Sequence, residues 1–222
     1  MKNEKAIKSN LSNYIHRIDD LLNQHSKSAK KWLNNALKIA QENHFEEYEI
    51  DLLIRQSIYA ATIEHNQKKE AAILRECMQR SKALNYKRGI AQIKARQILN
   101  ANNKVDYKTV RERCEEIIEM KLGKDDSSTT YVFNMFAFIE MIHGRFESAQ
   151  SHLEKALALG EYQNNLIQVS FTHIVKAMVE RNIGQHQQAL EDALKAVELL
   201  EPTKFHERKA AAMNAVAGCY AF

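Results

Sequence analysis

The segment GRFESAQSHLEKALAL, residues 144–159, recurs forty positions later as GQHQQALEDALKAVELL, residues 184–200. The first copy begins with a glycine and has an alanine five residues on, Ala149, and another seven residues further, Ala156. The second copy has glycine and alanine at the same places. Such spacing is typical of an amphipathic helix whose small residues let a neighbouring helix approach closely. The sequence therefore predicts an array of packed helices.

The amino-acid composition favours an all-α fold. The chain of 222 residues contains one proline and six glycines, which leaves little material for hairpin turns. Ala, Leu, Glu, Lys and Gln, which are strong helix formers, dominate. An apolar content of 45% with 27% charged residues is ordinary for a protein that buries a large core.

Apolar residues at helical spacing predict five helix pairs followed by a final helix. Residues 102–106, NNKVD, are expected to form a turn. Residues 123–130, GKDDSSTT, are expected to form a loop, with Gly123 ending one helix and Ser127 or Ser128 capping the next. The expected helices cover about 5–24, 25–41, 46–65, 67–84, 86–101, 107–122, 131–142, 144–159, 163–182, 187–200 and 206–222.

The second helices of the five pairs share a regular series of small or apolar residues. The first place in each series is assigned to Ala29, Ala71, Val110, Ala149 and Ala189, at intervals of 42, 39, 39 and 40 residues. The second place is assigned to Ala36, Met78, Ile117, Ala156 and Ala196. A period near 40 built from two antiparallel helices is typical of a solenoid, in which stacking of repeats completes the core.

The two copies that define this series resemble the second half of a tetratricopeptide repeat (TPR). The pattern G-x-[aromatic or His]-x-x-A-x-x-x-[apolar]-x-x-A-[Leu or Val] is met at Gly144, Phe146, Ala149, Leu153, Ala156 and Leu157, and again at Gly184, His186, Ala189, Ala193, Ala196 and Val197. The resemblance extends over nearly the whole chain and is strongest for residues 128–202.

The first helices depart from the TPR pattern. In the fourth pair Phe133, Phe136, Ala137 and Glu140 stand where the family has Trp, Leu-Gly and Tyr. The period also exceeds the usual TPR length of about 34 residues. The chain is more similar to the extended repeats of bacterial peptide-pheromone receptors and of the sensory halves of bacterial regulators. The resemblance implies a right-handed α-α superhelix, in a single TPR-like domain over residues 1–222.

In TPR proteins the first helices line the concave face, so the resemblance implies that a ligand meets these helices. Asn, Gln and Arg there can hydrogen-bond a peptide main chain or carboxylate, and Phe and Met provide adaptable apolar contact. An alternative is that the polar residues are simply solvated and that Phe138 and Phe171 pack between repeats. The residues expected to face the groove are Gln56, Gln92, Arg96, Asn134, Phe138, Phe171, Met178, Arg181 and Asn214.

No pattern of catalytic or metal-binding residues is found. The nine histidines are scattered without HxxxH or HExxH spacing, and we expect most of them at the surface or in turns. The three cysteines, Cys77, Cys114 and Cys219, lie in apolar helical stripes and have no CxxC spacing, so we expect core thiols. We therefore expect a non-catalytic protein with no metal and no cofactor.

Charge and hydropathy limit the expected partners and location. The formal net charge is +4, from 32 basic and 28 acidic residues that are interspersed along the chain, and this favours a solvated surface over a nucleic-acid interface. No apolar stretch is long enough to span a bilayer, and no signal peptide is apparent. We expect a cytoplasmic protein without membrane partners.

Two functions fit these expectations. The first is a scaffold that binds a protein or peptide ligand. The alternative is the N-terminal sensory or dimerisation domain of a bacterial signalling protein whose output domain, a nucleotide cyclase, kinase or transcription regulator, follows residue 222. The apolar final helix lacks a pairing helix, so we expect the chain to be the front part of a longer protein, or to form a homodimer through this helix.

Overall fold

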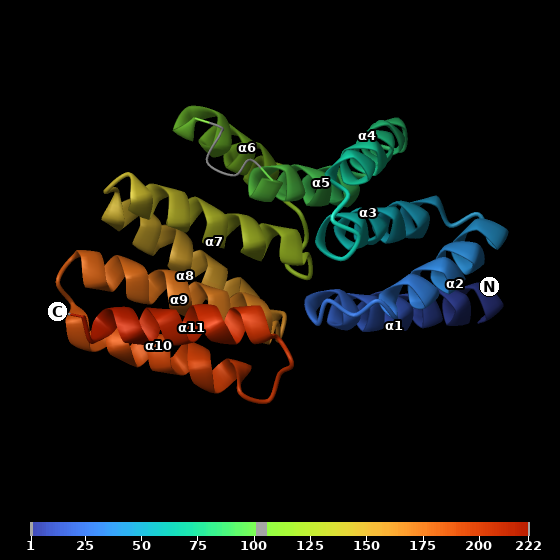
Figure 1. Ribbon diagram of the computed structural model, residues 1–222. Coiled ribbons are helices and arrows are strands. Elements are labelled where there is room, and N and C mark those ends of the chain that lie inside the picture. Colours follow the sequence, from blue (N-terminus) through green and yellow to red (C-terminus); the bar gives the residue numbers. More distant parts are fainter. Residues whose placement is uncertain (1, 101–105, 222) are drawn as a thin grey trace. The chain divides into compact units, whose positions relative to one another are not determined.

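The computed structural model describes residues 2–100 and 106–221, with side chains from residue 4 and without those of residues 99 and 100 (Figure 1). This part of the chain forms eleven α-helices and no strand, so the predicted all-α fold is confirmed. The helices are α1 (Lys2–Asn23), α2 (Ala29–Glu42), α3 (Glu46–Thr62), α4 (Gln67–Ala83), α5 (Lys87–Asn100), α6 (Tyr107–Glu119), α7 (Ser127–Ile142), α8 (Phe146–Tyr162), α9 (Leu166–Asn182), α10 (His186–Leu200) and α11 (His206–Cys219).

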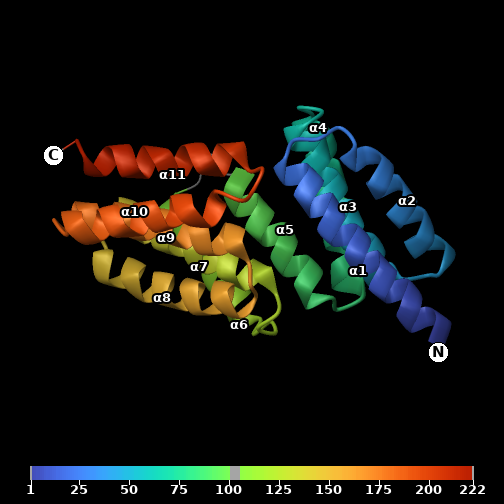
Figure 2. The same cartoon turned by 90° about the horizontal axis from the view of Figure 1, so that it is seen from below.

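The chain divides into two compact units, Met1–Ile93 (unit 1) and Lys94–Phe222 (unit 2). In unit 1, helices α1 to α4 each pack on the next, and α1 also contacts α3. In unit 2, α7, α9 and α11 contact one another in succession and form a continuous layer. Helix α8 packs across α7 and α9, and α10 packs across α9 and α11 (Figure 2).

Small residues allow α8 and α10 to fit against this layer. Ala149 and Ala156 of α8 and Ala189 and Ala196 of α10 are all fully buried, as their forty-residue spacing predicts. Gly160 continues the series in α8, and a Cβ there would lie 2.9 Å from the Cγ2 atom of Val169 in α9. The close approach of helices thus depends on side chains no larger than alanine at these places.

The predicted series is wrong by one residue in α4. Ala71 is exposed, and the buried positions of that helix are Glu70, Leu74, Cys77 and Ser81. Glu70 therefore takes the first place and Cys77, not Met78, the second. A search for small apolar residues passes over a buried glutamate, which explains the error. With this correction the steps between first places become 41, 40, 39 and 40 residues.

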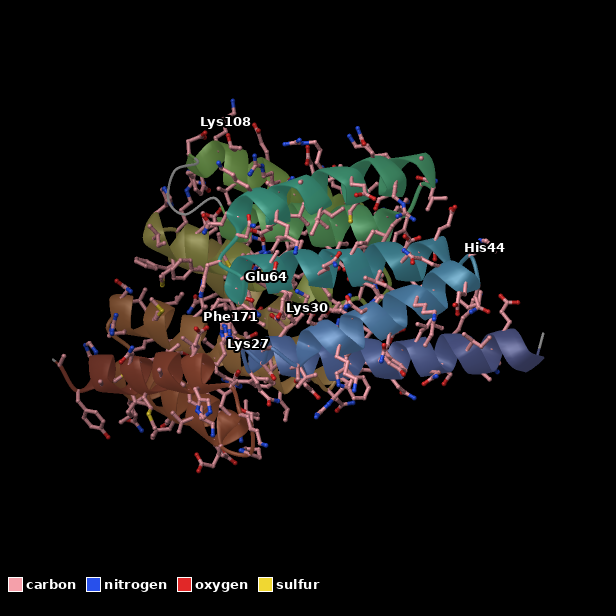
Figure 3. All side chains as sticks on the ribbon, turned by 45° about the vertical axis from the view of Figure 1, so that its right-hand side comes forward. Lys27, Lys30, His44, Glu64, Lys108 and Phe171 are labelled. Carbon is pink, nitrogen blue, oxygen red and sulfur yellow. The ribbon has the colours of Figure 1, made fainter. Side chains whose placement is uncertain are left out.

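The helices end in a turn that recurs about every twenty residues. A residue with positive φ follows each of several helices: His25, His44 (Figure 3), His65, Asn85, Lys121, Gly144, Asn164 and Gly184. After α2, Phe45 N–H donates to the Ala40 carbonyl at 2.9 Å and His44 N–H to the Gln41 carbonyl at 3.1 Å. This pair of bonds satisfies the last carbonyls of the helix. The prediction of turn histidines is thus confirmed for three of them.

The predicted loop at residues 123–130 is too long. Helix α7 already begins at Ser127, and its N-cap is Asp126, whose carboxylate accepts from Ser128 N–H at 2.9 Å. Gly123 does not end α6, because Lys121 adopts the left-handed conformation in that turn. Serine and threonine fit the first turn of a helix as well as a loop, so composition alone misplaces this boundary. The turn predicted at 102–106 lies, except for Asp106, outside the described residues.

None of the described helices combines the length and the apolar character that a membrane crossing requires. Acidic and basic side chains are interspersed over their surfaces (Figure 3). Cys77 and Cys114 are fully buried and Cys219 is partly buried, and all three are free thiols, as the apolar stripes predict.

Candidate functional site

The nine residues expected to face a groove all lie on odd-numbered helices, but not all in one unit. Gln56 in α3 and Gln92 in α5 belong to unit 1. The others belong to unit 2, where α7 and α9 are in contact, as are α9 and α11. These seven are Arg96, Asn134, Phe138, Phe171, Met178, Arg181 and Asn214.

Several of these residues hold helices together. Asn134 is fully buried, and its Nδ2 atom donates to the main-chain and side-chain oxygens of Gln168, each at 3.3 Å, which joins α7 to α9. Phe138 and Phe171 are partly buried against the core between α7 and α9. Asn134 therefore lies inside the layer, while Asn214 of α11 is exposed.

Arg181 and Met178 occupy the contact between α9 and α11. The Arg181 guanidinium lies against Gly218, in the space that a side chain at position 218 would take. Met178 packs against the core that α9, α10 and α11 share. Both side chains are partly buried, so their contacts within the protein already use much of their surface.

A cluster of cationic and aromatic side chains forms where successive odd-numbered helices meet in unit 2. Arg208 of α11 places its Cζ atom 4.6 Å from the ring centre of Phe171 in α9. Tyr131 of α7 lies close enough to Arg208 and to Arg96 of α5 that both positive charges act on its hydroxyl. We call these four residues the arginine–aromatic cluster.

The cluster is poorly solvated. Burial lowers the pKa of Arg208, against the opposing influence of Tyr131 and Glu207. Burial raises the pKa of Tyr131, and the charges of Arg208 and Arg96 only partly offset that rise. Within the described side chains the Tyr131 hydroxyl is enclosed and has no hydrogen-bond partner.

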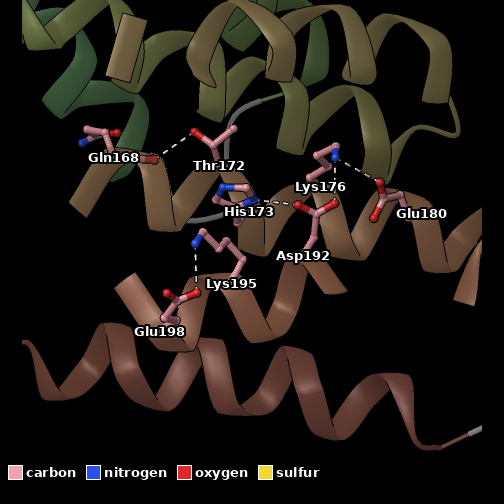
Figure 4. A network of polar contacts seen from close by, with 8 residues as sticks. All are labelled: Gln168, Thr172, His173, Lys176, Glu180, Asp192, Lys195 and Glu198. Atoms are coloured by element: carbon pink, nitrogen blue, oxygen red, sulfur yellow. Dashed lines mark hydrogen bonds and ion pairs between the residues drawn. The ribbon is translucent and has the colours of Figure 1, made fainter. Parts of the chain in front are cut away.

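A second polar group, which we call the α9–α10 network, lies inside unit 2 (Figure 4). Asp192 of α10 accepts from Nδ1 of His173 at 2.6 Å and from Nζ of Lys176 at 2.7 Å. Lys176 also lies 3.4 Å from the carboxylate of Glu180, one turn further along α9. The contacts of Asp192 with His173 and Lys176 tie α10 to α9.

Burial and hydrogen bonding shift the pKa values of the two carboxyl groups of this network in opposite directions. Burial raises the pKa of Glu180 to about 7, and the nearby Asp192 adds to that rise. Burial also raises the pKa of Asp192, but the hydrogen bonds from His173 and Lys176 favour its charged form and hold the pKa at about 2. Glu180 therefore keeps its proton to a higher pH than an ordinary glutamate, while Asp192 stays ionised through much of the acidic range.

Other candidate sites in the described residues are metal-binding groups, reactive thiols and the pocket between α8 and α9. In the described residues no three His, Cys, Asp or Glu side chains gather so as to hold a metal ion. Burial raises the pKa of Cys77 and Cys114 to about 12, which keeps both thiols protonated near neutral pH. A pocket of about 180 Å³ between α8 and α9, which Lys176 lines, is smaller than typical ligand pockets of roughly 300 Å³ or more.

Sequence reasoning named Arg96 and Phe171 of the arginine–aromatic cluster but missed Tyr131, Arg208 and the whole α9–α10 network. His173 was expected at the surface or in a turn, yet its side chain is only 13% exposed. A signal was available, since His173, Lys176 and Glu180 follow at helical spacing and so share one face of α9. The partner Asp192 lies in the next helix, where sequence spacing gives no guide to the contact. Tyr131 lies in the second turn of α7 and Arg208 in the first turn of α11, and neither carries a comparable signal.

Comparison with known proteins adds no relative. Neither the protein-family models nor the curated protein sequences compared with this chain give a match.

Proposed function

We propose that this protein is a non-catalytic scaffold that binds a protein or peptide through the layer of α7, α9 and α11. We further propose that its helix pairs wind as the right-handed superhelix of TPR-like proteins. Under this proposal α8 and α10 are structural, and the odd-numbered helices of unit 2 present the ligand-binding side chains.

The observation that carries the proposal is the arginine–aromatic cluster. Four helices contribute one side chain each, and the helical framework holds these side chains in place before any ligand arrives. Arginine and aromatic residues provide much of the binding energy at protein interfaces, because they combine large contact area with directional donors. A preorganised set of this kind loses little conformational entropy on binding.

The packing of unit 2 supports the choice of this layer. Helices α8 and α10 use alanine and leucine at their contacts, and these residues are buried and unavailable to a ligand. In contrast, Arg208, Phe171 and Arg96 are only partly buried. The three free cysteines also fit the reducing conditions of the cytoplasm, where we propose that the scaffold acts.

A display selection with random peptides against the whole chain tests the proposal. Synthesised peptides from the selection should bind the wild type measurably in calorimetry, and Phe171→Ala should weaken them by about tenfold or more. Tyr162→Ala is the matched control, since Tyr162 is an exposed aromatic residue of α8. Circular dichroism checks that both variants stay folded. If Tyr162→Ala weakens peptide binding and Phe171→Ala does not, the peptides bind on α8 and the proposal is wrong.

A further inference from the structure

Building on the proposed scaffold function, we propose that the arginine–aromatic cluster is an oxyanion site, in which Arg208 binds a carboxylate or phosphate group of the ligand and Arg96 adds positive charge.

The first argument is that Arg208 lacks an anionic partner. Arg55 makes a bidentate pair with Asp19, at 2.8 and 2.9 Å. Arg80 makes another with Glu49, at 3.1 and 2.7 Å. Arg208 forms no salt bridge with any described carboxylate, although the charge of neighbouring Glu207 acts on it. A cation withdrawn from water without a counter-ion is costly, so the site is set up to gain from an anion.

The second argument is that Tyr131 lacks an acceptor. Two other tyrosine hydroxyls, those of Tyr86 and Tyr107, donate to carboxylates, to Asp51 at 2.9 Å and to Glu140 at 2.7 Å. The enclosed Tyr131 hydroxyl has no such acceptor among the described side chains. Arg208 and the Tyr131 hydroxyl therefore both lack a carboxylate partner, whereas the other arginines and tyrosines just compared have one. A single oxyanion supplies what both lack.

The orientation of Arg208 suits this role. Its guanidinium lies over the ring of Phe171, and a guanidinium that stacks on an aromatic face keeps its N–H edge for a second partner. That edge presents two parallel donors, which match the two oxygens of a carboxylate or phosphate. Because the Tyr131 hydroxyl is enclosed while Arg208 is only partly buried, the anion meets Arg208 first.

The other buried charges of unit 2 do not call for a ligand. In the α9–α10 network Lys176 and His173 already face Asp192. Glu140 accepts from Tyr107 and lies near Arg145. Lys176, His173 and Glu140 thus each have a hydrogen-bonding or oppositely charged partner within the protein, whereas Arg208 pairs with no described carboxylate.

Thermal unfolding of the whole chain with inorganic phosphate and, separately, with acetate tests the site, with sodium chloride at equal ionic strength as the reference. The wild type should melt at a higher temperature with at least one anion, and the more effective anion identifies the ligand group. Arg208→Met should remove this rise, and Arg208→Lys should weaken anion binding by about tenfold, since the bidentate edge is lost. Arg75→Met removes an exposed arginine of α4 and should respond as the wild type does.

Without anion, Arg208→Met should melt no lower than the wild type, because it removes an unpaired charge. Equal anion responses of the wild type and Arg208→Met would overturn the oxyanion site. The display-selected peptides separate this proposal from the scaffold function. If they bind both proteins equally, the scaffold stands and the oxyanion site falls. If no peptide binds while phosphate or acetate still acts through Arg208, the oxyanion site stands and the scaffold falls.

Discussion

The two helix layers of unit 2 bury different kinds of residue. Apart from Asp192, the buried positions of α8 and α10 hold only alanine, leucine and glycine. Helices α7 and α9 also bury polar and charged residues, which are Ser128, Thr130, Asn134, Glu140, Ser170, Thr172 and Glu180. Helix α9 contacts four other helices, α7, α8, α10 and α11, so a polar residue on nearly any of its faces becomes enclosed.

The small buried residues that recur every forty positions therefore lie on α8 and α10. The buried polar residues of α7 and α9 have partners that differ from one repeat to the next. Glu140 and Glu180 occupy the same place forty residues apart, and both are buried. Their partners differ, since Glu140 accepts from the Tyr107 hydroxyl and Glu180 pairs with Lys176. Small residues on α8 and α10 can recur without such partners because close packing needs only their size.

The largest effect is expected from breaking the α9–α10 network. Asp192→Ala should lower the free energy of unfolding by about 2 to 4 kcal/mol, because Lys176 and His173 lose their buried partner. Glu198→Ala, which removes a largely exposed salt bridge with Lys195, is the control and should cost less than about 1 kcal/mol. Urea denaturation measures both. A cost for Asp192→Ala no greater than that of the control would show that the network is not structural.

The same network should make stability depend on pH. The pKa of Glu180 is raised from 4.5 to about 7 in the folded state, so its contribution is fully present below pH 4.5 and is lost as pH rises through 7. Asp192 has the opposite sign, and its contribution is lost as pH falls from 3.8 toward 2. Between pH 5 and 8 the wild type should therefore lose up to about 3 kcal/mol relative to Glu180→Gln. A constant difference between the two proteins across this range would contradict the shift of Glu180.

Overpacking tests the contact layer of α8 and α10. Ala189→Leu should destabilise the protein by about 1 to 3 kcal/mol or more, since the added methyl groups enter a fully buried contact. Ala71→Leu in α4 makes the same change at an exposed position and should alter stability by less than about 0.5 kcal/mol. Thermal melting compares them. If Ala71→Leu is as costly as Ala189→Leu, the corrected series with Glu70 is wrong.

The smallest effect is expected at the turns. Gly184 has a φ of +82°, so Gly184→Ala should cost about 1 kcal/mol through backbone strain. Gly123 lies outside the left-handed region, and a Cβ at that position would meet no atom within 4 Å, so Gly123→Ala should change stability little. Urea denaturation measures the free energy of unfolding of both variants. An equal cost for the two would show that the positive φ of Gly184 does not determine the effect.

The sequence was sufficient for the features that repeat. Composition predicts the all-α class, and the alanine spacing predicts the buried places of α8 and α10. Positions where one residue departs from the repeat were not predicted. Glu70 replaces a small residue in α4, and Asp126 caps α7 ahead of the expected start. The contacts within the polar groups were not predicted either, because they join residues of different helices. Asp192 meets His173, and Arg208 meets Phe171. Which residues meet across helices depends on how each helix is rotated, and periodicity fixes that only for the apolar face.

The most direct test of the account is to map where a display-selected peptide binds, using amide chemical shifts of the whole chain. The account predicts that the largest changes fall on α7, α9 and α11, centred on Phe171 and Arg208, and that α8 and α10 change little. Changes concentrated on α8 and α10, with Phe171 and Arg208 unaffected, would contradict it.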